Sequence, residues 1–133
     1  MKRHRNVWLG LAALALAALL VRDLLRHPGP ADLKGEFKEI AFVRNEQNKG
    51  GIIRIYAFTV SHPVEADYLG CGDLLPHNDY GSLTKAYFFE SGAPAPTTLR
   101  LSPPHFDTTR FRPLAVYSKD KDGIGRVERV GMP

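Results

Sequence analysis

The chain opens with a long apolar run behind a short basic tail. Residues 7–21 carry no charge, and they follow Lys2, Arg3 and Arg5. As a helix these fifteen residues span only about 22 Å, less than the ~30 Å hydrocarbon core of a bilayer. Leu24 and Leu25 continue the apolar side beyond residue 21, which extends the span to about 28 Å. We therefore predict a transmembrane helix over residues 7–26.

A basic tail before an apolar core is also the order of a cleavable secretory signal. Cleavage requires small residues shortly after the core. Ala15 with Ala17 would split the apolar run, and Gly29 with Ala31 lies far beyond it and encloses Pro30. A retained signal anchor is therefore favoured, and a cleaved signal peptide remains the alternative.

The distribution of Lys and Arg predicts the orientation. The positive charges lie in residues 1–6, which should stay in the cytoplasm as a basic tail, so that the rest is exported. Residues 27–33, rich in Pro and Gly, are expected to form a stiff stalk. Residues 34–133 then form the exported domain. In a bacterium this is a single-pass inner-membrane protein, anchored through residues 7–26, with a periplasmic C-terminal domain.

The exported part alternates between branched or aromatic residues and polar ones, a pattern typical of strands. Turn-prone residues separate the first two segments, and Asp122-Gly123 separates the last two, so two hairpins are expected. The predicted strands are residues 38–44, 52–60, 83–90, 97–101, 114–118 and 124–130.

This pattern predicts a mainly β fold, namely a small antiparallel sheet, a sandwich or a partly open barrel. Residues 63–75 are expected to hold one short helix or an irregular loop. A helix over residues 33–41 stays open, since its apolar positions also fit helical spacing. The aromatic residues are expected to fill one core, and they include Phe42, Tyr56, Phe58, Phe88, Phe89 and Tyr117.

The charge of the domain argues against nucleic-acid binding. The whole chain has a net charge of +4, but residues 34–133 contain thirteen Lys and Arg against twelve Asp and Glu. A nucleic-acid-binding domain needs a positive patch on its folded part. We therefore expect no nucleic-acid partner.

Cys71 is the only cysteine, so the domain has no internal disulfide. A buried small side chain is the favoured interpretation, ahead of a disulfide to another chain or a regulatory thiol. A catalytic thiol is the least favoured, with His77, Asp79 and His105 available as base and orienting groups. No catalytic residue is therefore assigned outside this alternative.

Residues 55–84 contain no Lys or Arg but hold the nitrogen and sulfur ligands His62, Cys71 and His77. Such ligands suit zinc or copper, yet their spacing matches no closed metal-site pattern. Residues 118–123 resemble the start of a calcium loop, but the twelfth position is Arg129 instead of Glu. We expect a plain hairpin turn there, and no metal or other cofactor.

A segment rich in Arg and aromatic residues lies near the C-terminus. Arg and aromatic side chains dominate protein interfaces, and Arg also binds carboxylate or phosphate. Solubilising charges on strand edges are the alternative. The predicted partner-binding residues are Arg100, His105, Phe106, Arg110, Phe111 and Arg112.

No phosphate-binding loop, nucleophile elbow or dinucleotide motif is present, and no stretch carries the motif of a known family. The favoured hypothesis is a membrane-anchored periplasmic protein-binding module. It would be an accessory subunit of an envelope complex or an immunity-type inhibitor of an effector, with another envelope protein as its partner. The alternative is a small cysteine- or metal-dependent envelope hydrolase.

Overall fold

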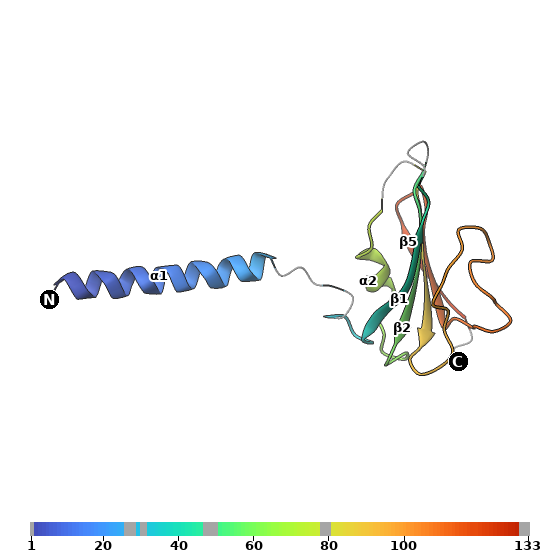
Figure 1. The fold of residues 1–133 in the computed structure, drawn as a ribbon, viewed down its shortest axis with the longest axis horizontal. Helices are drawn as coiled ribbons and strands as arrows, with labels where there is room; N and C mark the ends of the chain where they lie inside the picture. Colours follow the sequence, from blue (N-terminus) through green and yellow to red (C-terminus); the bar gives the residue numbers. More distant parts are fainter. Residues whose placement is uncertain (1, 26–28, 30–31, 47–50, 78–80, 131–133) are drawn as a thin grey trace.

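The computed structural model describes residues 2–25, 29, 32–46, 51–77 and 81–130. An N-terminal helix, α1 (Lys2–Leu25), precedes a five-stranded sheet (Figure 1). The strands follow chain order across the sheet, and a short helix, α2 (Tyr68–Asp73), lies between the second and third. The strands are β1 (Phe37–Arg44), β2 (Ile53–Val60), β3 (Leu83–Glu90), β4 (Ala115–Lys119) and β5 (Gly125–Arg129).

Helix α1 is long and apolar enough to cross a membrane. The candidate span covers His4–Arg22, and every side chain described within it is exposed. In Figure 1 the helix extends away from the sheet. A signal sequence has the same length and composition, so the span itself does not distinguish an anchor from a cleaved leader.

The mainly β fold is confirmed, with one change in its topology. β1 and β2 form the expected antiparallel hairpin, and so do β4 and β5. β2 and β3, however, are parallel, so the sheet is mixed and open instead of antiparallel. Parallel neighbours need a crossover of a dozen or more residues, and the segment that carries α2 supplies it.

One predicted strand is wrong, and one alternative that the sequence left open is excluded. Residues 97–101 form no strand but lie in the long connection between β3 and β4. The helix considered over residues 33–41 is absent, because Phe37 already begins β1. Strand β1 also contains a bulge, since its pairing with β2 shifts between Glu39 and Ala41. Such a bulge leaves one residue outside the ladder and bends the strand.

The apolar residues form two cores, one on each face of the sheet, where a single core was expected. On the face that carries α2, Tyr56, Phe58, Phe88 and Tyr117 are buried together with Cys71. We call this side the α2 face. Phe89 belongs instead to the second cluster, on what we call the loop face. The cause is the two-residue repeat of a strand, which sends Phe88 and Phe89 to opposite sides.

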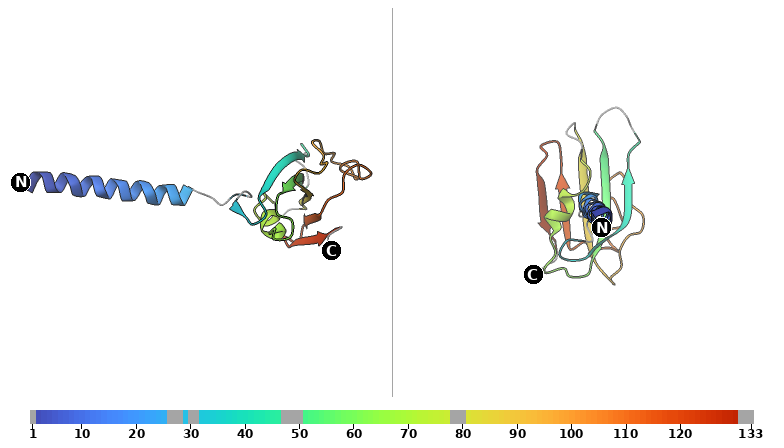
Figure 2. Two further views of the ribbon diagram at one scale, coloured as in Figure 1. Left: turned by 90° about the horizontal axis from the view of Figure 1, so that it is seen from below. Right: turned by 90° about the vertical axis from the view of Figure 1, so that its left-hand side faces the viewer.

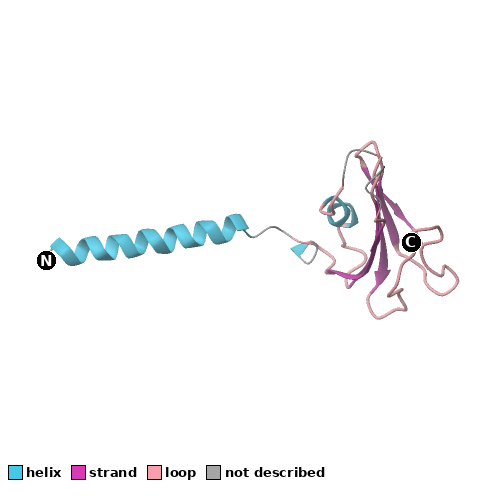
Figure 3. Ribbon diagram, turned by 45° about the horizontal axis from the view of Figure 1, so that its top comes forward, coloured by secondary structure: helices cyan, strands magenta, loops and turns pink. Residues whose placement is uncertain are grey.

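Helix α2 covers only part of its face. It packs against β3, β4 and β5, and Figure 2 shows it in front of that half of the sheet. The other half, over β1 and β2, is more open, and Phe42 there is 46% exposed. The Phe42 ring contacts the Tyr56 ring in a tilted arrangement, with 4.7 Å between the ring centroids. Figure 3 shows α2 on one side of the sheet and the long loop on the other.

Local hydrogen bonds explain why such a short helix forms. Asp67 caps its N-terminus by accepting from the backbone N–H of Gly70 at 2.9 Å, a common way to satisfy a free helical donor. At the other end, the Tyr117 hydroxyl donates to Asp73 at 2.7 Å. Gly72 is required because a Cβ there would lie 2.1 Å from the Tyr117 ring. The helix can therefore sit directly on β4.

Candidate partner-binding groove

The connection between β3 and β4, residues 91–114, is long and contains no helix or strand. We call it the β3–β4 loop. Loops of this length in a small domain are uncommon and usually functional or disordered. This one is packed onto the loop face of the sheet, where Ala95, Leu99 and Phe111 contact the second core. It is therefore an ordered part of the fold.

Phe106 anchors the loop to the sheet. Its ring meets Tyr87 edge-to-face at 4.9 Å and Phe89 at 5.4 Å. Edge-to-face pairs of this kind add about 0.5–1.5 kcal/mol each to the burial of the rings. Because Phe106 is only 6% exposed, its role in the structure is to hold the loop in place.

A pair of short hydrogen bonds closes one part of the loop on itself. The backbone N–H of Arg100 donates to the His105 carbonyl at 2.7 Å, and His105 Nδ1 lies 2.7 Å from the Arg100 carbonyl. Since a carbonyl only accepts, Nδ1 must carry the proton. The buried His105 ring also lies 5.9 Å from Tyr87. The backbone that bears Arg100 is thus fixed while its side chain stays exposed.

A second turn presents Arg110. The Asp107 carboxylate accepts from the Thr109 hydroxyl at 2.6 Å and from the Thr109 N–H at 3.0 Å. These bonds from Thr109 hold the pKa of Asp107 below its ordinary value, since they stabilise the ionised form. The Arg110 guanidinium lies over the Phe111 ring at 5.2 Å, a distance suited to a cation–π contact.

Together these turns enclose a half-open groove of about 850 Å³. Its lining carries the exposed guanidinium groups of Arg100 and Arg110. Neither has an ion-pair partner within the residues that the structure describes. The one carboxylate in the lining, Asp107, accepts two hydrogen bonds from Thr109, and the Arg110 charge also contributes to its lowered pKa. Most of the remaining lining residues are prolines and threonines, including Pro94, Pro96, Thr98 and Thr108.

The groove brings together five of the six residues predicted to bind a partner. Arg100, His105, Phe106, Arg110 and Phe111 all line it. Arg112 is exposed but lies outside the lining. His105 and Phe106 are buried and hold the loop, so the surface available to a partner comes chiefly from the arginines.

The alternative catalytic set is not assembled. Cys71 is fully buried in the core of the α2 face, and burial together with the nearby Asp67 raises the pKa of its thiol to about 12. His105 lies against Tyr87, on the loop face, so the sheet separates it from Cys71. Asp79 lies outside the described residues. His77 is engaged elsewhere, as described next.

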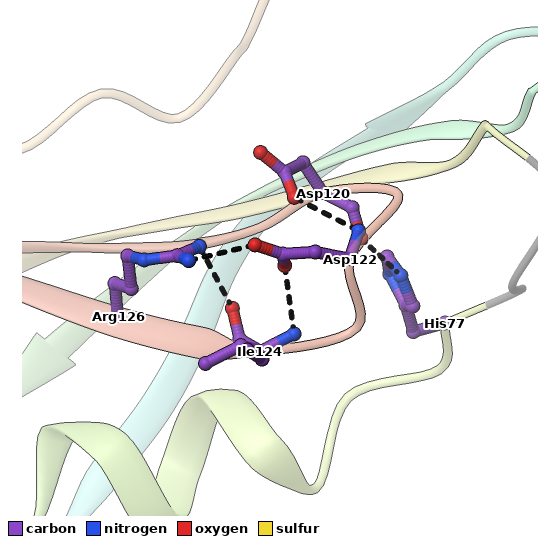
Figure 4. Close-up of polar contacts among 5 residues, drawn as sticks. All are labelled: His77, Asp120, Asp122, Ile124 and Arg126. Carbon is purple, nitrogen blue, oxygen red and sulfur yellow. Dashed lines mark hydrogen bonds and ion pairs between the residues drawn. The ribbon is translucent and has the colours of Figure 1, made fainter.

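His77 ties the crossover to the turn between β4 and β5 (Figure 4). Its Nε2 lies 2.9 Å from the Asp120 carbonyl, and its Nδ1 lies 3.1 Å from the Thr84 hydroxyl. His62 lies elsewhere, 3.9 Å from Glu36 on the surface. No three His, Cys, Asp or Glu side chains gather as metal ligands in the described part of the chain.

The β4–β5 connection is the hairpin turn that the Asp-Gly pair predicts, with Gly123 at a positive φ of 73°. Figure 4 shows how its acids are used. Asp120 accepts from the Asp122 N–H, and Asp122 accepts from the Ile124 N–H. The Arg126 guanidinium also donates to Asp122 at 2.6 Å, and this bond holds the pKa of Asp122 far below its ordinary value.

Two polar residues that the sequence reasoning did not single out are buried. Arg54 and Ser82 each have a side-chain atom, Nη1 and Oγ respectively, without a hydrogen-bond partner in the described structure. A signal existed for Arg54, because it is the only charge within the apolar run of β2, IRIYAFTV. A buried charge without a partner is costly, so this site is considered further below.

Comparison of the chain with protein-family models, with curated proteins and with solved structures returns no match.

Proposed function

We propose that the protein is a membrane-anchored binding module whose β3–β4 loop receives a carboxylate-bearing segment of another envelope protein. Helix α1 serves as a retained anchor in the bacterial inner membrane, and the sheet domain works in the periplasm. The observation that carries this proposal is the groove of about 850 Å³ with two exposed, unpaired guanidinium groups in its lining.

Charge and geometry both favour an acidic partner. A guanidinium presents a planar fork of N–H donors that matches the two oxygens of a carboxylate. Arg100 is held by the bonds to His105, and Arg110 follows the Asp107 turn. Because the loop is already ordered, less conformational entropy is lost when a partner binds.

The proposed anchor adds to the binding. Restriction to the membrane raises the effective concentration of the domain near other envelope proteins. An accessory subunit of an envelope complex and an immunity-type inhibitor of an effector both fit this arrangement. In either case the partner acts at or near the membrane.

The test is co-purification from detergent-solubilised membranes. Full-length wild type, a double variant Arg100→Glu/Arg110→Glu and the control Lys121→Glu are compared by quantitative mass spectrometry. Lys121 is an exposed residue of the β4–β5 turn, at a distance in sequence from the loop. We expect the double variant to lose at least tenfold of a partner that wild type and Lys121→Glu recover equally, because repulsion replaces attraction at the groove.

A partner recovered equally by all three proteins would refute the groove as the binding surface. Partial loss should depend on salt, since exposed charges are screened over about 8–10 Å at physiological ionic strength. The hydrolase alternative has no comparable support, since the thiol of Cys71 is buried with a raised pKa.

A further inference from the structure

A row of three basic residues and one threonine crosses the α2 face where the parallel strands β2 and β3 begin. The strand register aligns Arg44 with Arg54, Arg54 with Thr84, and Thr84 with Lys119. Residues that pair across strands point to the same face of a sheet. We call Arg44, Arg54, Thr84 and Lys119 the basic row. With strands about 4.8 Å apart, it is about 14 Å long.

The row adjoins the core but is not covered by α2 over β1 and β2. A second aligned set lies two residues away from the basic row on each strand. It consists of Phe42, Tyr56, Ala86 and Tyr117. Burial raises the pKa of the Tyr56 phenol, while Arg54 and Arg44 lower it and Glu39 raises it, which places these three charges near that ring. Phe42, above Tyr56, is 46% exposed, so this end of the face is reachable from solvent.

Arg54, second in the row, makes no ion pair with any residue that the structure describes. It is only 8% exposed, and its Nη1 has no hydrogen-bond partner in the described part of the chain. Ser82, 2% exposed, precedes Thr84 by two residues, and its Oγ is also without a partner. The alternation of an extended chain places Ser82 on the same side as Thr84. An unpaired buried charge on β2 and an unpaired buried hydroxyl just before the neighbouring strand β3 indicate an absent group that accepts hydrogen bonds.

The nearby acids described in the structure are used by other groups. Asp73 accepts from the Tyr117 hydroxyl, and Asp122 is paired with Arg126. The Asp120 carboxylate accepts from the Asp122 N–H, and Figure 4 shows it within the turn. Glu39 and Glu46 are exposed and make no ion pair with a described residue. None of these acids neutralises Arg54.

We propose that the basic row binds the phosphate group of a ligand, with Arg54 and Ser82 donating hydrogen bonds to its oxygens and Arg44 adding charge from the neighbouring strand. A phosphate carries up to two negative charges and several acceptor oxygens, which suits clustered cations better than a carboxylate does. Lys119 and the His77–Thr84 pair close the far side of the row. The site lies on the opposite face of the sheet from the β3–β4 loop and does not depend on the function proposed for that loop.

The experiment follows thermal unfolding of the full chain in neutral detergent micelles by near-UV circular dichroism. Inorganic phosphate is titrated against chloride at constant pH and ionic strength. Wild type should gain about 5 °C or more at ten times the dissociation constant, because a ligand that binds only the folded state stabilises it. Arg54→Met should gain nothing. Arg100→Met, which removes an arginine on the other face, should respond as wild type does.

Melting temperatures measured without phosphate distinguish a loss of phosphate binding from a folding defect. If Arg54 lacks a counter-charge, Arg54→Met should melt at the same temperature as wild type or higher, since an apolar side chain of similar length removes a buried charge. The proposal is overturned if three results occur together: Arg54→Met melts at a lower temperature than wild type, Asp79→Asn does so too, and phosphate does not stabilise wild type. The counter-charge of Arg54 would then come from the chain itself. Equal phosphate stabilisation of wild type and Arg54→Met would place the ion elsewhere and also overturn it.

A second arm identifies the source of the phosphate. The full chain is placed in nanodiscs of phosphatidylcholine with and without phosphatidic acid. Stabilisation by phosphatidic acid that Arg54→Met loses would assign a lipid headgroup. Stabilisation by inorganic phosphate alone would assign a soluble ligand. If neither probe stabilises wild type more than Arg54→Met, no phosphate site exists.

Discussion

Burial determines the chemistry of Cys71 at the scale of single residues. Its side chain is enclosed by the core of the α2 face, and its N–H donates to the Asp67 carbonyl within α2. Burial, followed by the effect of Asp67, raises the pKa of the thiol to about 12. A thiolate is needed for nucleophilic attack, so the folded protein holds this cysteine in its unreactive form.

The raised pKa predicts a loss of stability at alkaline pH. The unfolded thiol ionises near its ordinary value of 9, while the folded thiol stays protonated up to about 12. The contribution of Cys71 is therefore complete below pH 9 and is lost between pH 9 and about 12. Cys71→Ala should cost about 1 kcal/mol at pH 7, and its free energy of unfolding should fall less than that of wild type between pH 9 and 10. Denaturant titrations measure both.

A thiol reagent gives the control for this prediction. Ellman's reagent at pH 8 should label Cys71 only when the protein is unfolded. Rapid labelling of the folded chain would contradict the burial described above and would reopen the regulatory or catalytic interpretations.

The sequence predicts residue environments unevenly, and Phe88, Phe89 and Arg54 show why. Alternation along β3 indicates that two consecutive phenylalanines face opposite ways, but it does not show that both faces are covered. The second core depends on Phe106, which lies 17 residues further along the chain. Arg54 presents the reverse case, because its burial results from packing that no local pattern reveals. Strand patterns indicate faces, whereas burial depends on tertiary contacts.

At the scale of elements, the β3–β4 loop depends on one aromatic anchor. Phe106 contacts both Tyr87 and Phe89, and these alternate residues reach it from one strand. The turns that carry Arg100 and Arg110 lie on either side of this anchor. The groove should therefore lose its shape when the anchor is removed.

Phe106→Ala should lower the free energy of unfolding by about 3–5 kcal/mol, the usual cost of deleting a buried phenylalanine. Amide hydrogen exchange should accelerate across residues 91–114 more than in β2 and β3. Phe42→Ala is the matched control, since Phe42 is 46% exposed and its removal should cost about 1 kcal/mol. Equal effects of the two substitutions, or unchanged exchange in the loop, would show that the loop is held by other contacts.

The topology could be predicted only in part, because hairpins depend on local sequence whereas the pairing of β2 with β3 does not. Hairpins are encoded locally, and Asp122-Gly123 indicates the β4–β5 turn without further information. The parallel pairing of β2 and β3 requires knowing that the segment with α2 crosses over the sheet. The branched residues at 97–101 are compatible with a strand, yet they pair with no strand in the described structure. Leu99 instead packs onto the second core.

At the scale of the whole molecule, the proposed role depends on α1 remaining attached. Full-length protein expressed in a bacterium should resist alkaline extraction from membranes, and terminal sequencing should find a start within residues 1–5. A mature start at Ala18 or Asp32 would mean that the leader is removed and that the domain is released. Recovery of the intact chain in the cytosol would refute the export of the domain as well.

The bulge in β1 has a consequence for proteins crowded side by side. An unprotected outer strand offers its free N–H and C=O groups to the next copy and invites edge-to-edge aggregation. At Glu39 and Ala41 the spacing of those groups is interrupted, while the opposite margin, β5, carries the exposed charges of Arg126, Glu128 and Arg129. Neither edge strand can readily extend the sheet into a fibril, so neighbouring molecules should stay separate from one another.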